Sequence, residues 1–334
     1  MKKIVLSLFV ATSLIACSDD ENTTTETTQN YSSGYLITNE GIFNSNNADV
    51  TYISSDFLSN ENQLFRKVNN RALGDVAQSI AQNSEYVFVV MNNSNTIEVV
   101  KKNTFQTVTT ITQNINQPRY ATISSNKLWV TNAGNNTVTS YNLSDFSASN
   151  TITLDFTPEY IESTPGYILI STNPWAETNK IETYSTDTNQ LAHSREVDAA
   201  INGLLSKDNL VYALASDENI TQIYELSGQH SLIRHQTNES NSRFISLDED
   251  KLYYTTGVNI NQYDILSQTH STLFSVPDTG WSAIYGFNVY NQQFFVADAK
   301  SFSEAGEIVI YNANGQAQKT VKTGIGPNGI YKIQ

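Results

Sequence analysis

The sequence predicts an all-β protein, a seven-bladed β-propeller closed by its C-terminal strand. Three observations predict this fold: a hairpin pattern that occurs seven times, a spacing of about 40 residues between its copies, and a strand-like segment left over at the C-terminus. Such a period is typical of propeller blades with four strands each. Strand-forming residues are plentiful, with 18 Tyr and 14 Phe against 2 Met, and no stretch after the leader sustains a helical period.

Each hairpin consists of an apolar run, a polar turn and a second run. The first runs lie at residues 34–37, 86–89, 127–130, 167–170, 210–213, 251–254 and 293–296. The steps between equivalent positions are 41, 40, 43, 41 and 42 residues for Val87, Leu128, Ile168, Val211, Leu252 and Phe294. One position near the end of the second run is occupied by tyrosine in six of the seven hairpins and by Val100 in the other. The six tyrosines are Tyr52, Tyr141, Tyr184, Tyr224, Tyr263 and Tyr311.

Each hairpin after the first is preceded by a segment that we expect to form the innermost strand of its blade. These segments begin near Gly74, Pro118, Pro158, Ile201, Ser242 and Ser282. The first hairpin follows a polar tail and has no such segment, whereas residues 326–333 follow the last hairpin and resemble residues 117–123. We therefore expect the C-terminal segment to pair with the first hairpin. Closure of this kind joins the ends of the ring and removes exposed sheet edges.

The N-terminus matches a bacterial lipoprotein leader. Two lysines precede an apolar stretch that ends in Leu14-Ile15-Ala16-Cys17, a lipobox with cleavage before the cysteine. We expect residues 1–16 to be the signal peptide, Cys17 to be lipidated, and residues 17–33 to be a lipidated flexible tether, since residues 22–33 are almost free of apolar side chains. The propeller then spans residues 34–334. Cys17 is the single cysteine, so no disulfide is expected.

The negative net charge of the chain excludes one class of partner. The formal net charge is −14 and becomes −16 once Lys2 and Lys3 leave with the leader. A strongly acidic chain without a basic cluster repels phosphate backbones, so no nucleic-acid partner is expected. Residues 18–21, Ser-Asp-Asp-Glu, resemble the export signal that sends lipoproteins of Bacteroidota-type bacteria to the outer face of the outer membrane. The alternative is that they merely begin a solvated tether. The predicted localisation is the outer membrane, lipid-anchored and facing the exterior.

No catalytic or metal-binding pattern stands out. The four histidines, His193, His230, His235 and His270, show no zinc-ligand or triad spacing. Nucleophile-elbow, Walker and dinucleotide glycine patterns are also missing. The sequence therefore predicts a protein that is not an enzyme and that has no metal or cofactor, although propeller lyases assemble their sites from distant blades and leave equally faint traces.

Propeller geometry instead predicts a binding face. The turn between the second and third strands of a blade lies on the same face as the connection to the next inner strand. The side chains predicted to bind a ligand there are Asn39, Glu40, Phe43, Asp75, Asn93, Arg119, Asn132, Glu159, Trp175, Asn202, Arg243, Trp281, Tyr285, Asp298 and Asn328. Together they describe a polar funnel edged by aromatic rings, suited to a ligand with amides, hydroxyls or sugars.

Some of these residues have an alternative explanation, namely a role in turn conformation or in packing. Asn and Asp are common in tight turns for purely conformational reasons, whereas turns do not require Arg119, Arg243, Trp175 or Trp281. Trp129, inside a strand, is expected in the core. Three long turns, at residues 39–47, 173–179 and 298–306, are further candidates for binding because long loops on a rigid scaffold often carry function. Two of them belong to neighbouring blades and would present Phe43 and Phe302 together.

Several stretches resemble a known family. Residues 38–43, 71–79, 92–99, 117–120 and 285–286 are similar to those of the YncE-like, DUF5074-type propeller lipoproteins of Bacteroidota, over essentially the whole mature chain. The relatives that this resemblance brings in are BtuG-type surface lipoproteins, which capture cobalamin and pass it to a TonB-dependent transporter. The resemblance implies a substrate-capture protein whose partners are a small-molecule ligand and such a transporter, with cobalamin as a possible transported ligand.

Three hypotheses follow for the function. The first is a lipoprotein that binds cobalamin or a related corrinoid on the polar face and delivers it to a transporter. The second is a propeller that recognises a protein or a glycan in adhesion or scaffolding. The third is an envelope lyase, which would need histidines and carboxylates to converge in the channel.

Overall fold

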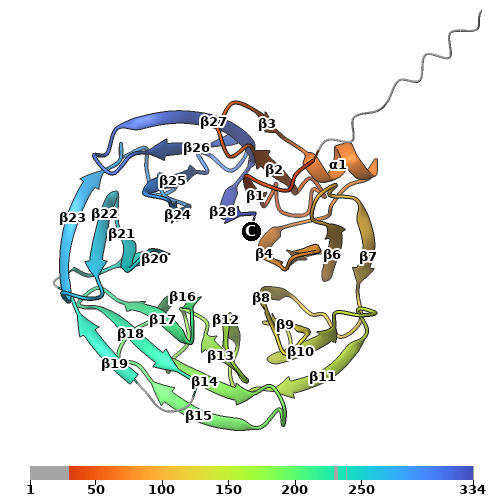
Figure 1. Cartoon of the computed structure of the whole chain (residues 1–334), viewed down its shortest axis with the longest axis horizontal. Coiled ribbons are helices and arrows are strands. Elements are labelled where there is room, and N and C mark those ends of the chain that lie inside the picture. Colours follow the sequence, from red (N-terminus) through yellow and green to blue (C-terminus); the bar gives the residue numbers. More distant parts are fainter. Residues whose placement is uncertain (1–29, 229–231, 238, 334) are drawn as a thin grey trace, which may run out of the picture.

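Seven four-stranded antiparallel sheets surround a central channel (Figure 1). The computed structural model describes residues 30–228, 232–237 and 239–333. Within them every sheet has its innermost strand beside the channel and its later strands farther out. The predicted seven-bladed β-propeller is confirmed.

The blades follow one another along the chain, and only the first combines strands from both ends of it. From the channel outward, blade one is β28 (Pro327–Lys332), β1 (Tyr35–Asn39), β2 (Asp49–Ile53) and β3 (Asn60–Glu61), and blade two is β4 (Ala77–Gln82), β5 (Tyr86–Met91), β6 (Thr96–Lys101) and β7 (Thr107–Ile111). Blade three is β8 (Pro118–Ser124), β9 (Lys127–Asn132), β10 (Thr137–Asn142) and β11 (Ala148–Thr153), and blade four is β12 (Pro158–Thr164), β13 (Tyr167–Thr172), β14 (Lys180–Ser185) and β15 (Leu191–Glu196).

The remaining three blades keep the same order. Blade five is β16 (Ile201–Lys207), β17 (Leu210–Ser216), β18 (Thr221–Ser227) and β19 (Leu232–Gln236). Blade six is β20 (Ser242–Asp248), β21 (Lys251–Thr256), β22 (Asn259–Asp264) and β23 (Thr269–Ser275). Blade seven is β24 (Gly286–Tyr290), β25 (Gln293–Asp298), β26 (Ala305–Tyr311) and β27 (Ala317–Ile325).

The C-terminal strand closes the ring as predicted. β28 pairs antiparallel with β1, and Ile37 lies opposite Ile330. Beyond the strand, the Ile333 amide donates a hydrogen bond of 2.9 Å to the Gly34 carbonyl. The two ends of the described chain therefore share one sheet, in which β28 covers the inner edge of β1.

In five blades the recurring tyrosine of the second run pairs with the equivalent position of the first run, as the repeat predicts. Leu36 pairs with Tyr52, Leu128 with Tyr141, and the same relation holds in blades four, six and seven. In blade five, Tyr224 pairs with Ala213, two residues beyond Val211. Because side chains alternate across a strand, a shift of two keeps Tyr224 on the same face of the sheet.

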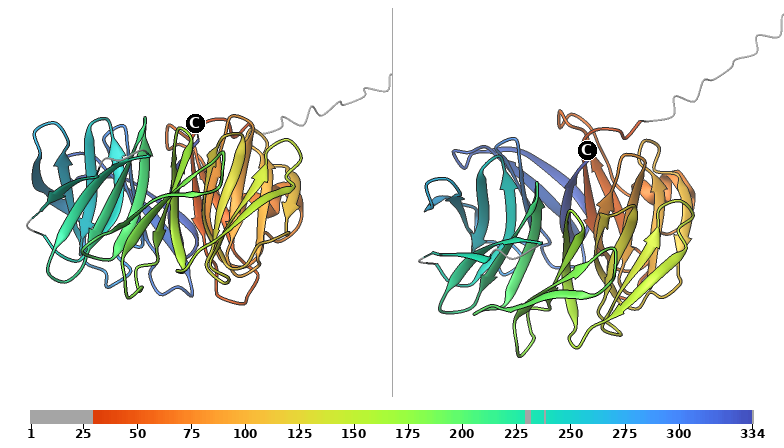
Figure 2. Two further views of the ribbon diagram at one scale, coloured as in Figure 1. Left: turned by 90° about the horizontal axis from the view of Figure 1, so that it is seen from below. Right: turned by 60° about the horizontal axis from the view of Figure 1, so that its bottom comes forward.

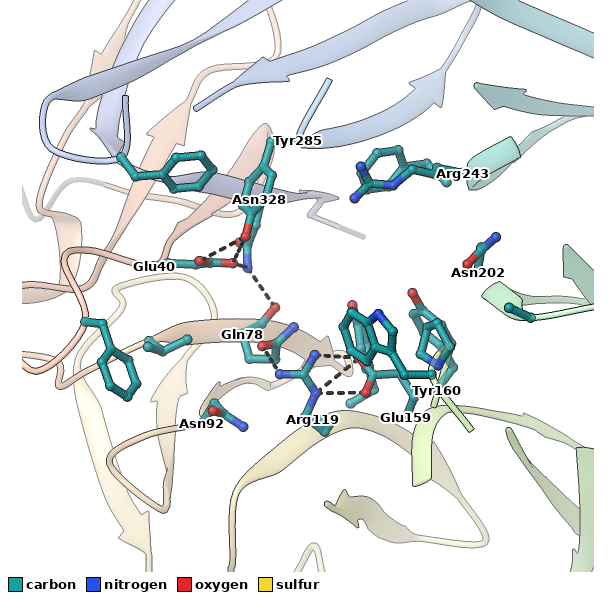
Figure 3. A pocket seen from close by; sticks show the side chains of 18 of the residues that line it. Glu40, Gln78, Asn92, Arg119, Glu159, Tyr160, Asn202, Arg243, Tyr285 and Asn328 are labelled. Atoms are coloured by element: carbon teal, nitrogen blue, oxygen red, sulfur yellow. Dashed lines mark hydrogen bonds and ion pairs between the residues drawn. The ribbon is translucent and has the colours of Figure 1, made fainter. Parts of the chain in front are cut away.

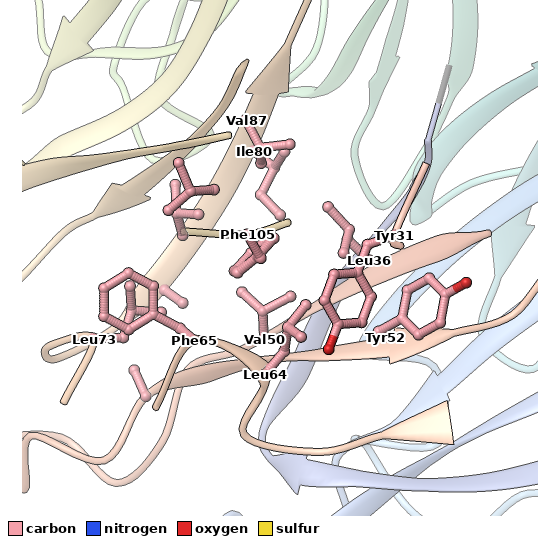
Figure 4. Close-up of a cluster of buried hydrophobic side chains, with 14 of the residues drawn as sticks. Tyr31, Leu36, Val50, Tyr52, Leu64, Phe65, Leu73, Ile80, Val87 and Phe105 are labelled. Atoms are coloured by element: carbon pink, nitrogen blue, oxygen red, sulfur yellow. The ribbon is translucent and has the colours of Figure 1, made fainter. Parts of the chain in front are cut away.

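Seven apolar clusters lie between neighbouring blades in the described part of the chain. Leu36 and Val87 share one cluster, drawn in Figure 4, whereas the adjacent Phe88 belongs to the next. Middle strands are therefore apolar at consecutive positions, because each sheet is covered on both faces. Trp129 is fully buried, as predicted.

Blade one departs from the repeat. Its outer strand β3 has two residues, and the short helix α1 (Leu64–Asn69) follows it, although no helix was predicted after the leader. Leu64 and Phe65 are fully buried, and the Phe65 amide donates a hydrogen bond of 3.0 Å to Asp49 Oδ1. Two consecutive apolar residues in a six-residue helix are too few to give a helical period.

The ends of the described chain and the loop after β1 lie at opposite faces of the ring. β1 starts at Tyr35 beside Lys332 and ends at Asn39 beside Pro327, and both ends of the described chain leave from the first of these faces (Figure 2). The predicted signal peptide, Cys17 and most of the predicted tether lie outside the described residues. Among the described residues no helix has the length and apolar character needed to cross a membrane.

Candidate functional site

A cavity of about 890 Å³ occupies the mouth of the channel on the face where β1 ends. Residues from all seven blades line it, including Glu40, Gln78, Arg119, Asn202 and Tyr285. Most come from the turn after a blade's second strand or from the start of an inner strand. The topology therefore brings the two predicted sets of residues together on one face.

Nine of the predicted residues line this cavity. They are Glu40, Phe43, Arg119, Glu159, Trp175, Asn202, Arg243, Tyr285 and Asn328. They come from positions 40 to 328 of the chain, so the folded ring alone makes them neighbours. Figure 3 shows the polar members around the cavity.

Six predicted residues lie outside the lining: Asn39, Asp75, Asn93, Asn132, Trp281 and Asp298. The amide-bearing and acidic members mostly bond between the turn after the second strand and the segment that enters the inner strand of the same blade. Asn132 is fully buried, and its Oδ1 accepts a bond of 3.1 Å from the Asn116 amide. Asn93 donates to Asp75 at 2.8 Å, and Asp298 accepts from Thr279 at 2.8 Å.

Asn39 is held by hydrogen bonds inside blade one and to the adjoining strand of blade seven, and Trp281 packs on a ring of the lining. Buried Asn39 donates to Thr51 at 3.0 Å and accepts from the Gly324 amide at 3.0 Å. Trp281 is 74% exposed and stacks on Phe302, with ring centroids 5.0 Å apart and planes at 11°. Since Phe302 lines the cavity, Trp281 lies directly behind its wall.

Arg119 is the centre of a charged network on one side of the cavity. Its Nη2 lies 2.6 Å from Glu159 Oε1, and its Nε bonds both Glu159 oxygens at 3.1 and 3.0 Å. Nη1 donates to Gln78 Oε1 at 2.7 Å. Burial lowers the pKa of Arg119, but the bonds and charge of Glu159 outweigh it and the net shift is upward. This arginine is charged and fully engaged.

Glu40 is the centre of a second network. Asn328 Nδ2 donates to its carboxylate at 2.9 Å, and the Tyr285 hydroxyl does so at 3.2 and 3.3 Å. Burial raises the pKa of Glu40, and the bonds from Asn328 and Tyr285 and the charge of Arg119 partly offset the rise. Both of these donors are neutral groups, so Glu40 has no cationic hydrogen-bond partner among the described residues.

Two asparagines in the lining are held through their amide nitrogens. Asn202 donates to the Ser242 carbonyl at 2.9 Å, and Asn92 donates to the Pro118 carbonyl at 3.0 Å. Within the described chain no donor bonds the oxygen of either amide. A ligand N–H or O–H is therefore the natural partner for these acceptors.

Aromatic rings line the deeper part of the cavity. Tyr120 and Tyr160 lie 4.7 Å apart between ring centroids, and Tyr331 and Phe244 join them in the lining. Burial raises the pKa of Tyr120 and Tyr160, so both hydroxyls are neutral at physiological pH. The cavity thus combines apolar ring surface with polar groups.

These rings were not predicted to line the cavity, and the structure gives the reason. Tyr120 follows Arg119 directly, and regular strand alternation places neighbours on opposite faces. The register of β8 shifts between Pro118 and Ala121, and a similar shift occurs in β12 between Pro158 and Ile161. Such bulges redirect side chains. The detectable pattern was a charged residue followed by an aromatic one at three inner-strand starts: Arg119-Tyr120, Glu159-Tyr160 and Arg243-Phe244.

The rim of the cavity carries strongly exposed rings. Trp175 is 83% exposed and Phe43 is 65% exposed. They belong to the long turns after β13 and β1, two of the three that were predicted as binding loops. Phe302, expected to be an exposed contact, is half-buried under Trp281. Exposed aromatic side chains beside a cavity are typical of binding surfaces.

None of the histidines that the structure describes lines the cavity. His270 Nδ1 lies 3.2 Å from Glu239 in blade six, and His235 packs against Tyr263. His230 lies outside the described residues. Across the described parts of the chain, no three His, Cys, Asp or Glu side chains gather as a metal site would require.

Comparison with known proteins identifies relatives in structure alone. No protein-family model matches the chain, and no curated protein matches it. A quinonprotein alcohol dehydrogenase-like protein from Bacteroides thetaiotaomicron has a TM-score of 0.70 at 15% identity, covering 92% of this chain and 79% of its own. A functionally unknown protein from Desulfotomaculum acetoxidans has a TM-score of 0.67 at 15% identity, covering 90% and 99%.

A third similar structure is the hydrazine synthase of Kuenenia stuttgartiensis, with a TM-score of 0.63 at 10% identity, covering 83% of this chain and 96% of that one. Identities this low carry information about architecture and none about activity. Together with the seven blades described above, these likenesses establish that the chain is a seven-bladed β-propeller.

Proposed function

We propose that the protein is a surface lipoprotein that binds a small nutrient molecule in the channel-mouth cavity and delivers it to a TonB-dependent transporter. The observation that carries the proposal is the cavity itself, which is lined by all seven blades. Its volume of about 890 Å³ lies toward the upper end of the range usual for small-molecule sites, about 300–1,000 Å³. The ligand that we favour is cobalamin or a related corrinoid.

The chemistry of the lining supports a corrinoid. The amide oxygens of Asn92 and Asn202 suit donors such as the peripheral amides of a corrin ring. Tyr120 and Tyr160 offer apolar ring surface to the macrocycle edge. Trp175, on the rim, would contact the part of a large ligand that protrudes from the cavity.

The orientation of the cavity supports capture from the medium. The described chain begins on the face opposite the cavity, so a lipid on Cys17 would hold that opposite face toward the membrane. Residues 18–30 would allow a reach of up to about 45 Å if fully extended. That reach permits the propeller to turn its cavity toward a membrane-embedded transporter for delivery.

Calorimetric titration with cyanocobalamin tests the proposal. The chain from Ser18 onward retains Tyr31, which packs in the cluster between blades one and two. Expected is saturable binding at micromolar concentration that is weakened by Trp175→Ala. Absence of heat and of colour retention at these concentrations would exclude cobalamin as the ligand.

A glycan is the second candidate ligand. The observation that favours it is the exposure of Trp175 and Phe43 on the rim, since sugar rings stack on exposed aromatic faces. Titration with oligosaccharides on the same protein distinguishes the two. Binding of an oligosaccharide without binding of cyanocobalamin would support recognition of a glycan instead.

A further inference from the structure

The cavity contains two arginines whose surroundings differ. Arg119 is bound by Glu159 and Gln78, and its charge is neutralised within the protein. Arg243 also lines the cavity, yet no carboxylate of the described chain lies within ion-pair distance of it. The guanidinium of Arg243 is therefore available to an anionic group of a ligand in the cavity.

Arg243 projects into the cavity from the side opposite Arg119 (Figure 3). Its side chain is exposed, and its guanidinium carbon lies 5.0 Å from the ring centre of Phe244. Its charge lowers the pKa of Tyr160 and of Tyr285, each of which burial raises overall. The positive field of Arg243 therefore acts on groups of the lining itself.

The backbone around Arg243 holds the side chain in this place. The Thr255 hydroxyl donates to the Arg243 carbonyl at 2.8 Å. The register of β20 shifts between Arg243 and Ile245, and Phe244 has a φ of 50°. A left-handed conformation costs energy for a bulky residue, and such strain is concentrated at functional sites. Here the bulge directs both the guanidinium and the ring that supports it toward the cavity.

We propose that Arg243 binds an anionic group of the ligand, a carboxylate or a phosphate, while the body of the ligand lies against Tyr120, Tyr160 and Phe244. Arginine presents paired N–H donors that match both anions. Arg119, on the opposite side, is already paired with Glu159, so among the described residues of the lining Arg243 is the cation that remains for the anion. This inference rests on the proposed function in taking the cavity as a ligand site, and it defines the ligand as a molecule with an anionic group and a large ring system.

Two pairs of compounds test the inference. Flavin mononucleotide and riboflavin differ only in the phosphate, whereas dicyanocobinamide lacks the phosphodiester of cyanocobalamin together with its ribose and base. Each is titrated into the wild-type chain from Ser18 onward and into Arg243→Gln. The wild type is expected to bind the phosphate-bearing member of at least one pair more tightly than its counterpart. Arg243→Gln is expected to weaken that binding about 10-fold, the usual effect of one charge-assisted hydrogen bond at an accessible site.

The controls separate charge at this position from other effects. Arg234→Gln removes the same charge from outer strand β19, where Arg234 pairs with Asp198 at 2.7 Å, and binding is expected to stay unchanged. Arg243→Lys is expected to recover part of the affinity, because it keeps the charge and loses the paired donors. Higher salt is expected to weaken phosphate binding in the wild type and to have little effect on Arg243→Gln.

The outcomes distinguish this inference from the proposed function. Arg243-dependent binding of flavin mononucleotide without binding of cyanocobalamin keeps the anion site and rejects the corrinoid. Equal binding of cyanocobalamin by the wild type and Arg243→Gln keeps the corrinoid and overturns the anion site. If neither phosphate-bearing compound binds at millimolar concentration, the anion site is overturned as well.

Discussion

Arg119 and Glu159 begin the inner strands of neighbouring blades, and their side chains form an ion pair of 2.6 Å across the blade boundary. Both are largely shielded, with 23% and 7% of their side chains exposed. The pair ties β8 to β12 at the cavity wall. Tyr120 and Tyr160, which follow these two residues in the chain, have ring centroids 4.7 Å apart and line the same cavity. The starts of β8 and β12 therefore supply both the ion pair and these two rings.

Breaking this pair is expected to lower stability. Arg119→Met leaves Glu159 shielded from water without its cation, and we expect the free energy of unfolding to fall by about 2 kcal/mol. Chemical denaturation measures it. The double variant Arg119→Met with Glu159→Leu is expected to regain part of the loss, because no charge is then left unpaired. An unchanged midpoint in Arg119→Met would show that the pair contributes nothing.

Closure of the ring is expected to depend on Ile330. This side chain is 2% exposed and packs between blades seven and one. Ile330→Ala is expected to cost about 2–4 kcal/mol of unfolding free energy, the usual effect of truncating a buried aliphatic side chain. Leu266→Ala is the control, since Leu266 is 79% exposed. Equal stability of the two variants would contradict tight closure.

Glu162 is expected to make stability depend on pH. Burial raises its pKa to about 7, although Ser206 donates a hydrogen bond of 2.8 Å to its carboxylate. A raised pKa in the folded state favours the protonated form, so its stabilising effect is complete below about pH 4.3, the ordinary value for glutamate, and is lost as pH rises through 7. Denaturation of the wild type and Glu162→Gln across this range is the measurement. The wild type is expected to lose stability relative to the variant as pH rises, and a constant difference would argue against the shift.

Trp175 is expected to act in binding and not in folding. Its side chain is largely exposed, so Trp175→Ala is expected to leave the melting temperature within about 1 °C of the wild type, as is usual for surface substitutions. If the cavity binds cyanocobalamin, the affinity is expected to fall several-fold through lost contact area. Phe57→Ala is a contrasting control, because Phe57 stacks on buried Tyr35 away from the cavity and is expected to lower the melting temperature without affecting binding.

The number of blades, the tyrosine register in five of them and the closure of the ring could be predicted from the sequence. The reason is that each blade repeats one local pattern and must cover both faces of its middle strands, as Leu36 and Ile37 do in two different clusters. A period of this kind is visible along the chain without any tertiary information. The face that collects Arg119 and Trp175 followed from connectivity alone.

Which polar residues reach the cavity, and which of them have partners, depends on contacts between blades and could not be predicted from the sequence. Bulges at the inner-strand starts turn Tyr120 and Phe244 toward the channel, against the alternation that a strand pattern predicts. Asn132, at the end of β9, and Asn202, at the start of β16, were both predicted to bind, yet the first is buried and the second lines the cavity. The pairing of Arg119 depends on Glu159, 40 residues farther along the chain. Such contacts leave no local trace, because they arise only when separate blades meet.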